Sequence, residues 1–215
     1  MQMNRRATRI VVVVGVGVAV VGLAGLGRGR LSGRATGYPP GDCKVSTGKT
    51  DDGVLEAWAH CEWPLPAERV DSILGVFADQ ERHFSGVAES EVLRVDGERT
   101  LVRQVQQASG ISDREVVLEF VAEAIPNGTR YRWRKASDQS GRNPDNVECE
   151  VHEGYWEITR TGDKTTVDYH LRYLPGGSVP SFLVSAFLSS GVEGALGDLR
   201  QAAFAQQVAS RDGGD

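Results

Sequence analysis

The sequence predicts an α+β fold, in which a curved antiparallel sheet of about seven strands is gripped by one long C-terminal helix. Three observations predict it. From residue 54 onwards, short segments alternate apolar and polar residues with the period of two that a half-buried strand requires. Turn signals such as Asp96-Gly97 and Asn127-Gly128 join several of these segments, which favours hairpins. The last part of the chain changes to helical spacing, and a one-sided sheet needs such a helix as its cover.

The first half of the pattern contains a strand, a helix and a hairpin. Residues 54–63 form the first strand, whose apolar face consists of Leu55, Ala57, Ala59, Cys61 and Trp63. Pro64 ends this strand, because proline cannot donate a ladder hydrogen bond. Residues 67–83 then have the apolar spacing of a helix. The second and third strands, 87–95 and 99–107, form the first hairpin.

The second half of the sheet consists of four more strands. Residues 113–123 form the fourth, and the fifth, which contains Tyr131 and Trp133, follows the Asn-Gly turn. A polar loop precedes the sixth strand at 147–159, and a Gly-Asp turn leads to the seventh at 165–174. Strands that follow one another through tight turns form an antiparallel meander.

The final helix, residues 180–208, has an apolar stripe that fits the concave face of such a sheet. Gly191, Gly194 and Gly197 interrupt it, and each glycine costs about 1 kcal/mol of helix propensity relative to alanine. Close approach to the sheet, room for a ligand and a local break in the helix all explain this spacing. The predicted architecture is a helix-grip fold, which commonly leaves a ligand-sized cavity between sheet and helix.

The net charge of −5 combines two different parts of the chain. Residues 1–37 contain six arginines and no acidic residue, so the rest of the chain carries −11. Residues 10–26 are uncharged and mostly apolar, and as a helix they span about 26 Å, the short limit for a bilayer. Residues 1–30 are therefore predicted to be a signal peptide or a transmembrane anchor, and cleavage stays open. A linker (31–50), a ligand-binding domain (51–209) and a tail (210–215) follow.

Several classes of function are excluded or disfavoured by composition and motifs. An acidic body argues against nucleic acid as a partner, since phosphate binding needs basic surface. In an oxidising compartment one pair among Cys43, Cys61 and Cys149 can form a disulfide and leave one free thiol, but the sequence does not say which pair. No metal-ligand spacing, phosphate-binding loop or nucleophile motif occurs, so we expect no metal, no cofactor and no catalytic residue.

Three segments carry a family resemblance: Gly-Tyr-Trp-Glu-Ile at 154–158, Thr-Thr-Val-Asp-Tyr at 165–169, and Leu-Pro-Gly-Gly-Ser-Val-Pro-Ser-Phe-Leu at 174–183. In these segments the chain resembles the START domain, the steroidogenic-acute-regulatory-related lipid-transfer type of the polyketide cyclase and birch-allergen superfamily. The resemblance covers residues 51–207 and is most specific over 154–183. It implies a tunnel-like cavity that holds one lipid or another hydrophobic molecule.

Strand parity then selects the side chains expected to face this cavity, because residues two apart share a face. An inward charge must be paired or bind something polar, so Arg103, Arg114 and Glu153 are candidates for holding the polar end of a ligand. An internal salt bridge is the alternative for these charges, and ordinary core packing is the alternative for the inward aromatic residues. The complete set of predicted ligand-binding residues is Arg103, Arg114, Tyr131, Trp133, Glu153, Tyr169 and Tyr173.

The function expected from these observations is non-enzymatic binding or transfer of a lipid or other hydrophobic molecule. We expect a monomer in the cell envelope, either anchored in the membrane by the N-terminal helix or exported. Two alternatives stay open. One is an enzyme of the polyketide cyclase and aromatase type that uses the same cavity through acid–base residues such as Glu153 or His152. The other is an envelope-tethered interaction module with a filled core.

Overall fold

The computed structural model describes residues 41–107, 112–179 and 181–212, and within the last helix it describes the side chains of residues 188–205. The predicted signal peptide or anchor at 1–30 lies outside these residues, as does the first part of the predicted linker. Along the chain the elements are β1 (Cys43–Lys49), β2 (Leu55–Trp63), α1 (Ala67–Leu74), the short 3-10 helix η1 (Phe77–Asp79), α2 (Gln80–His83), β3 (Val87–Asp96), β4 (Arg99–Gln106), β5 (Arg114–Ile125), β6 (Gly128–Lys135), β7 (Val147–Glu148), β8 (Val151–Thr161), β9 (Lys164–Leu174) and α3 (Ser181–Asp212).

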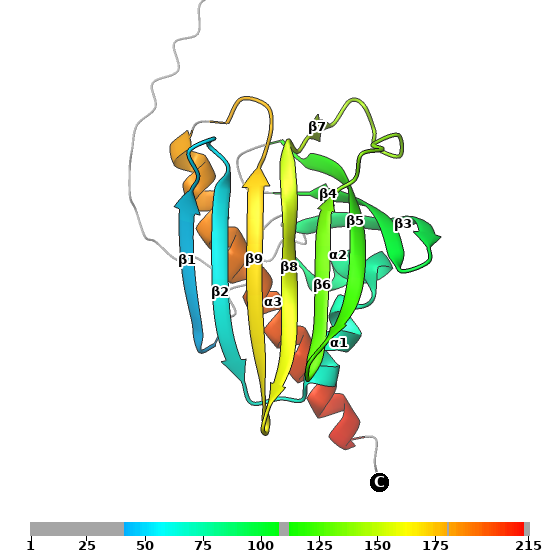
Figure 1. Ribbon diagram of the computed structural model, residues 1–215, viewed down its shortest axis with the longest axis vertical. Helices are drawn as coiled ribbons and strands as arrows, with labels where there is room; N and C mark the ends of the chain where they lie inside the picture. The colour runs from blue at the N-terminus through cyan, green and yellow to red at the C-terminus, as the bar shows by residue number, and fades with distance from the viewer. Residues whose placement is uncertain (1–40, 108–111, 180, 213–215) are drawn as a thin grey trace, which may run out of the picture. The chain divides into compact units, whose positions relative to one another are not determined.

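The strands of the described chain form one sheet in the order β1-β2-β9-β8-β6-β5-β4-β3, and β7 pairs with β5. All neighbours along this path are antiparallel, and only the short β7 runs parallel to its partner. Figure 1 shows α3 crossing one face of the curved sheet, with α1 and α2 on the same side. The predicted α+β helix-grip fold is confirmed.

The core lies between the sheet and these helices. The predicted apolar face of β2 is buried, with Ala57, Cys61 and Trp63 fully inaccessible to solvent. From α3, Leu196 and Leu199 pack against this face and are also fully buried. Burying a side chain of this size contributes about 1.5–3 kcal/mol, so the stripe of α3 is a major source of stability.

Four details of the fold differ from the prediction. The second half of the predicted linker forms β1, which pairs along its whole length with β2. The predicted helix 67–83 is interrupted at Gly75 and continues as η1 and α2. The predicted sixth strand is divided into β7 and β8, which pair with different neighbours. The tail begins later than predicted, because α3 continues to Asp212.

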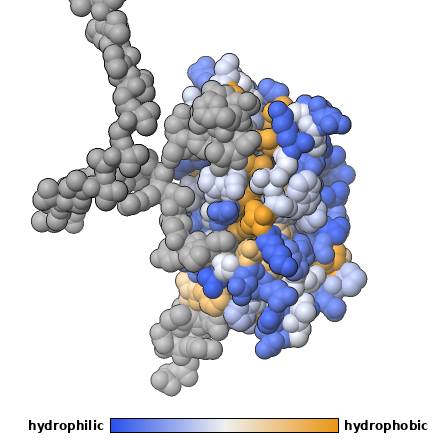
Figure 2. All heavy atoms as spheres, turned by 90° about the vertical axis from the view of Figure 1, so that its left-hand side faces the viewer, coloured by the Kyte–Doolittle hydropathy of each residue, from blue (hydrophilic) through white to orange (hydrophobic). Residues whose placement is uncertain are grey.

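The outer face of the sheet carries paired charges. On β6, Arg130, Arg132 and Arg134 pair with glutamates of neighbouring strands at N–O distances of 2.6, 2.5 and 2.7 Å. Viewed from the side on which β1 lies, the surface is mostly hydrophilic with a narrower apolar band (Figure 2). In the three described stretches of chain, no helix is both long and apolar enough to cross a membrane.

A disulfide joins Cys43 of β1 to Cys61 of β2, and Cys149 is a buried free thiol. This resolves the pairing that the sequence leaves open. The two cysteines face each other in the register of the two strands. The bond therefore attaches the edge strand β1 to the core through the buried Cys61.

We expect the double variant Cys43→Ser/Cys61→Ser to lose about 3 kcal/mol in its free energy of unfolding, measured by urea denaturation. The reason is that the bond closes a loop with a sequence separation of 18 residues and restricts the unfolded chain. Cys149→Ser is the matched control for loss of a sulfur atom elsewhere. Equal stability of the double variant and the wild type would contradict this role of the disulfide.

Candidate functional site

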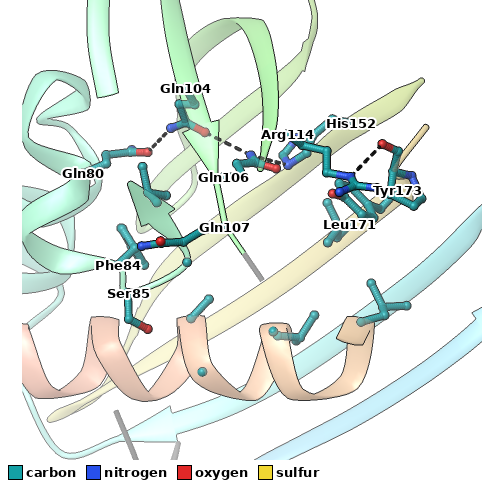
Figure 3. A pocket seen from close by; sticks show the side chains of 18 of the residues that line it. Gln80, Phe84, Ser85, Gln104, Gln106, Gln107, Arg114, His152, Leu171 and Tyr173 are labelled. Carbon is teal, nitrogen blue, oxygen red and sulfur yellow. Dashed lines mark hydrogen bonds between the residues drawn. The ribbon is translucent and has the colours of Figure 1, made fainter. Parts of the chain in front are cut away.

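A cavity of about 570 Å³ lies between the sheet and α3 (Figure 3). This volume is within the ~300–1,000 Å³ range that is usual for small-molecule sites. Much of its wall is aromatic and comes from the end of α2 and from β5, β6, β8 and β9. The aromatic residues are Phe84, Phe120, Trp133, Trp156, Tyr169 and Tyr173. Such a wall favours a hydrophobic ligand.

Arg114 lies at one end of the cavity and is only 5% exposed. Its guanidinium donates to three main-chain oxygens: Nε to Pro175 at 3.4 Å, Nη2 to Gly176 at 3.4 Å, and Nη1 to Ser112. Within the described part of the chain, Arg114 forms no ion pair with a carboxylate. A buried cation needs a compensating charge or strong hydrogen bonds. The site is therefore suited to an anionic group.

The Gly-Gly pair after β9 positions these acceptors. Gly176 has φ +68°, which L side chains rarely adopt, and a Cβ there would lie 2.1 Å from the main-chain oxygen of Glu148. Only glycine fits this turn, which directs the Gly176 carbonyl towards Arg114. The turn that carries part of the family resemblance thus supports the charged end of the cavity.

A chain of hydrogen-bonded side chains lines one wall, and Figure 3 shows it running from α2 across β4 to β8. We call Gln80, Gln104 and Gln106 the amide ladder. Oε1 of Gln80 lies 2.6 Å from Nε2 of Gln104, whose Oε1 lies 3.3 Å from Nε2 of Gln106. Nε2 of Gln106 lies 2.9 Å from Nε2 of His152, and Nδ1 of His152 accepts a hydrogen bond from Trp133 Nε1 at 3.0 Å.

His152 is a neutral group held by contacts at both ring nitrogens. The indole N–H of Trp133 donates to Nδ1, and Nε2 faces the side-chain amide of Gln106. Burial lowers the pKa of His152 to about 4, so the ring is uncharged at neutral pH. From the sequence, His152 is expected only as an acid–base residue of the alternative enzyme, and the structure places it in the cavity wall. In the cavity, His152 is a fixed hydrogen-bonding group rather than a cation.

The opposite wall is formed by α3, where Gly191 and Gly194 line the cavity together with Leu188 and Val192. Among the described residues, no atom lies within 4 Å of a Cβ added at Gly191 or Gly194. The helix is continuous through all three glycines. Of the three explanations that the sequence leaves open, room for a ligand is therefore the one that fits Gly191 and Gly194.

Four of the predicted ligand-binding residues line the cavity: Arg114, Trp133, Tyr169 and Tyr173. Burial raises the pKa of Tyr169 and of Tyr173 above the ordinary value, so both hydroxyl groups stay protonated. The Tyr173 hydroxyl lies 3.7 Å from the thiol of Cys149. Burial also raises the pKa of that thiol to about 11, so Cys149 is unreactive at neutral pH.

Arg103 is not at the cavity, contrary to the prediction. Its guanidinium forms ion pairs with Glu115 at 2.8 Å, Glu89 at 2.7 Å and Glu91 at 3.1 Å on the outer face of the sheet. These ion pairs are the internal salt bridge expected as the alternative to ligand binding. On β4 the residues that face the cavity are Gln104 and Gln106.

The prediction for Arg103 is wrong because a loop covers the outer face of β4 and β5. Gln139 of this loop donates to the main-chain oxygen of Val117 at 2.9 Å, and Asn146 bonds to Glu115. Val117 and Val105 are both buried although they point away from the cavity. Apolar residues on both faces make alternation a poor guide to the inner face.

Glu153 and Tyr131 are also displaced from the predicted site. Glu153 pairs with Arg172 on the outer face, because the interruption between β7 and β8 shifts the strand parity by one. Tyr131 points inward but lies beneath α1, where its hydroxyl donates to Asp71 Oδ1 at 3.1 Å. Tyr131 is therefore a core residue, and ordinary core packing is the alternative expected for the inward aromatic residues.

Glu115 is fully buried and accepts hydrogen bonds from Arg103, from the main chain of Asn143 and from Asn146. We expect Glu115→Gln to lower the free energy of unfolding by about 3 kcal/mol at pH 7, measured by urea denaturation, since a buried pair loses one charge. Glu91→Gln removes an exposed partner of the same arginine and is expected to cost less than about 1 kcal/mol.

The stabilisation from Glu115 should depend on pH. Burial alone would raise the pKa of Glu115, but the hydrogen bonds from Asn143, Asn146 and Arg103 lower it below 4.5. The stabilisation is therefore present above pH 4.5 and is lost as the pH falls through the lower folded-state pKa. A difference between wild type and Glu115→Gln that grows on acidification would contradict this assignment.

Among the described residues, no group of three or more histidine, cysteine, aspartate or glutamate side chains could hold a metal ion. The polar side chains that line the cavity are one guanidinium, one carboxylate (Asp113), four glutamine amides, one imidazole, two indole N–H groups, two serine hydroxyls and two phenolic hydroxyls. This set can bind an anion and donate or accept several neutral hydrogen bonds.

Comparison with known proteins agrees with this geometry. A family model described as "Polyketide cyclase / dehydrase and lipid transport" matches residues 59–206. The STAR-related lipid transfer protein of Xanthomonas axonopodis superposes with a TM-score of 0.68 at 22% identity, over 75% of this chain and 93% of that one. Human StAR-related lipid transfer protein 5 superposes with a TM-score of 0.70 at 12% identity, over 84% and 90% of the two chains. Comparison with curated proteins finds no match. The START-like fold inferred from the sequence is confirmed.

Proposed function

Because the chain belongs to the polyketide cyclase / dehydrase and lipid transport family, we propose that it binds one hydrophobic molecule with an anionic end group and carries it unchanged. The observation that supports this proposal is Arg114, a buried cation that forms no ion pair with a carboxylate in the described chain. A carboxylate or phosphate on the ligand would supply the missing charge.

In this proposal the ligand lies along the cavity with its polar end at Arg114. The hydrophobic part contacts the aromatic wall, including Trp133 and Tyr169, and the backbone of α3 at Gly191 and Gly194. Each CH2 group that leaves water contributes about 0.8 kcal/mol, so the apolar wall supplies most of the affinity. Arg114 then determines the orientation and the class of end group.

We place the protein in the cell envelope, as a monomer held by its N-terminal segment or exported across the membrane. Two features support this location. The apolar run at 10–26 follows three arginines, and disulfides such as Cys43–Cys61 persist mainly in oxidising compartments. The paired charges on the outer face of the sheet favour a solvated surface there.

Native mass spectrometry of the full-length chain, isolated from its expression host, tests the proposal. We expect a bound hydrophobic acid or phosphate ester, and transfer of this molecule between vesicles when the protein is added. A chain that carries no such molecule and accelerates no exchange would contradict the proposed function.

A cyclase-type enzyme is the second candidate, and His152 is the observation that favours it. The neutral ring lies in the cavity wall and is fixed by Trp133 and Gln106, as a proton-transferring group must be. Incubation with a linear poly-β-ketone thioester distinguishes the two functions. A cyclised product that disappears in His152→Phe would favour the enzyme, and recovery of unchanged thioester favours the carrier.

A further inference from the structure

The amide ladder is an unusual lining for a cavity that would hold only a hydrocarbon chain. Gln80 and Gln104 are 7% and 3% exposed, so both amides are withdrawn from bulk water. Burying an amide is unfavourable unless its hydrogen bonds are satisfied. Leucine or methionine would fill the same space without this cost, and a plain alkyl chain would not compensate for it.

The ladder has hydrogen-bonding capacity that no described residue uses. An amide offers two N–H donors and an oxygen with two lone pairs. Within the described chain, Gln104 uses one N–H group and one lone pair, and Gln80 uses only one lone pair. Both residues line the cavity. Their remaining donors and acceptors are available to a bound molecule.

The ladder is also at a defined place relative to Arg114. Gln106 lies opposite Arg114 in the register of β4 and β5. Gln104 is two residues further along the strand, a distance of about 7 Å. Gln80, on α2, bonds to the far side of Gln104 (Figure 3). A ligand whose end group contacts Arg114 therefore passes the ladder with its body.

We propose that the ladder is a second polar subsite, which recognises a hydroxyl group in the body of the ligand. This inference rests on the proposed function and names its ligand class: a hydroxylated hydrophobic acid rather than a plain one. A hydroxyl group both donates and accepts, so it bonds an amide through either its N–H or its oxygen. A methylene group at the same place would leave buried amides unsatisfied.

The test compares stearate with hydroxystearates that carry the hydroxyl at different carbons, by calorimetry on the full-length chain. We expect the wild type to bind at least one hydroxystearate about tenfold more tightly than stearate, the value of one good neutral hydrogen bond. In Gln104→Met this preference should disappear, while the affinity for stearate stays equal or rises. Gln80→Met removes the end of the ladder and should have the same effect with less disturbance of the fold.

Gln201→Met is the matched control, because Gln201 is exposed on α3, and it should keep the preference. Equal binding of stearate and of every hydroxystearate by the wild type would overturn the second subsite and leave the carrier function intact. A preference that survives in both ladder variants would overturn it as well. Failure of every probe, stearate included, would overturn the proposed function itself.

Discussion

Arg114→Leu is expected to bind an anionic hydrophobic ligand on the order of 10- to 100-fold more weakly than the wild type, and to retain less of it through purification. The guanidinium is buried at one end of the cavity, where a charge-assisted hydrogen bond is stronger than at the surface. Calorimetry with stearate measures the affinity, and native mass spectrometry measures the retained ligand. The loss should be much smaller for the corresponding uncharged alcohol, since it has no charge to pair with Arg114.

Two further variants separate charge from structure. Arg114→Lys keeps the positive charge but loses the planar fork, so it should recover part of the affinity. Arg99→Leu makes the same change as Arg114→Leu at a side chain that is 62% exposed on the outer face, and it should bind normally. If Arg114→Leu folds and binds both ligands as the wild type does, then Arg114 does not bind the ligand. Its role would be structural, as a hydrogen-bond donor to the main-chain oxygens of Ser112, Pro175 and Gly176.

The architecture of the sheet could be predicted because its inner face is regular. In β2 and β9 the buried residues alternate strictly, and the turns at Gly97, Asn127 and Gly162 have the positive φ angles that hairpins favour. β1 could not be predicted in the same way. Its Cys-Lys-Val-Ser-Thr-Gly-Lys sequence is mostly exposed at the sheet edge. The disulfide joins it to Cys61, a partner that the sequence does not specify.

Most of the correctly predicted site residues lie on strands with one buried face. Trp133, Tyr169 and Tyr173 lie on strands whose burial alternates, whereas Arg114 lies on β5, which is buried on both faces at residues 114–118. Gln104 and Gln106 resemble solvent-facing residues in the sequence, and only tertiary structure turns them inward. One signal in the sequence could have indicated a polar cavity wall. It is the pair Gln104 and Gln106, spaced two apart and followed by a segment rich in valine.

Gly194 tests whether the cavity itself is the binding site, and Gly194→Phe is expected to abolish binding of long-chain ligands while the fold persists. The Cβ of any side chain there would project into open space within a cavity of about 570 Å³. The benzyl group would occupy the region that the ligand needs. Glycine is the poorest helix former apart from proline, so the variant should unfold at an equal or higher temperature than the wild type. Thermal denaturation and calorimetry with stearate measure the two effects.

A smaller side chain at the same position separates helix propensity from occlusion. Gly194→Ala adds only a methyl group, so it should gain about 1 kcal/mol of stability and bind nearly as the wild type does. Gln201→Phe places the same ring on the exposed side of α3 and should leave binding unchanged. A Gly194→Phe protein that is folded and binds stearate normally would show that the ligand lies elsewhere. Stable folding combined with lost binding would instead mean that the glycines of α3 make room for the ligand, because they cost helix stability and no described residue fills the space beside them.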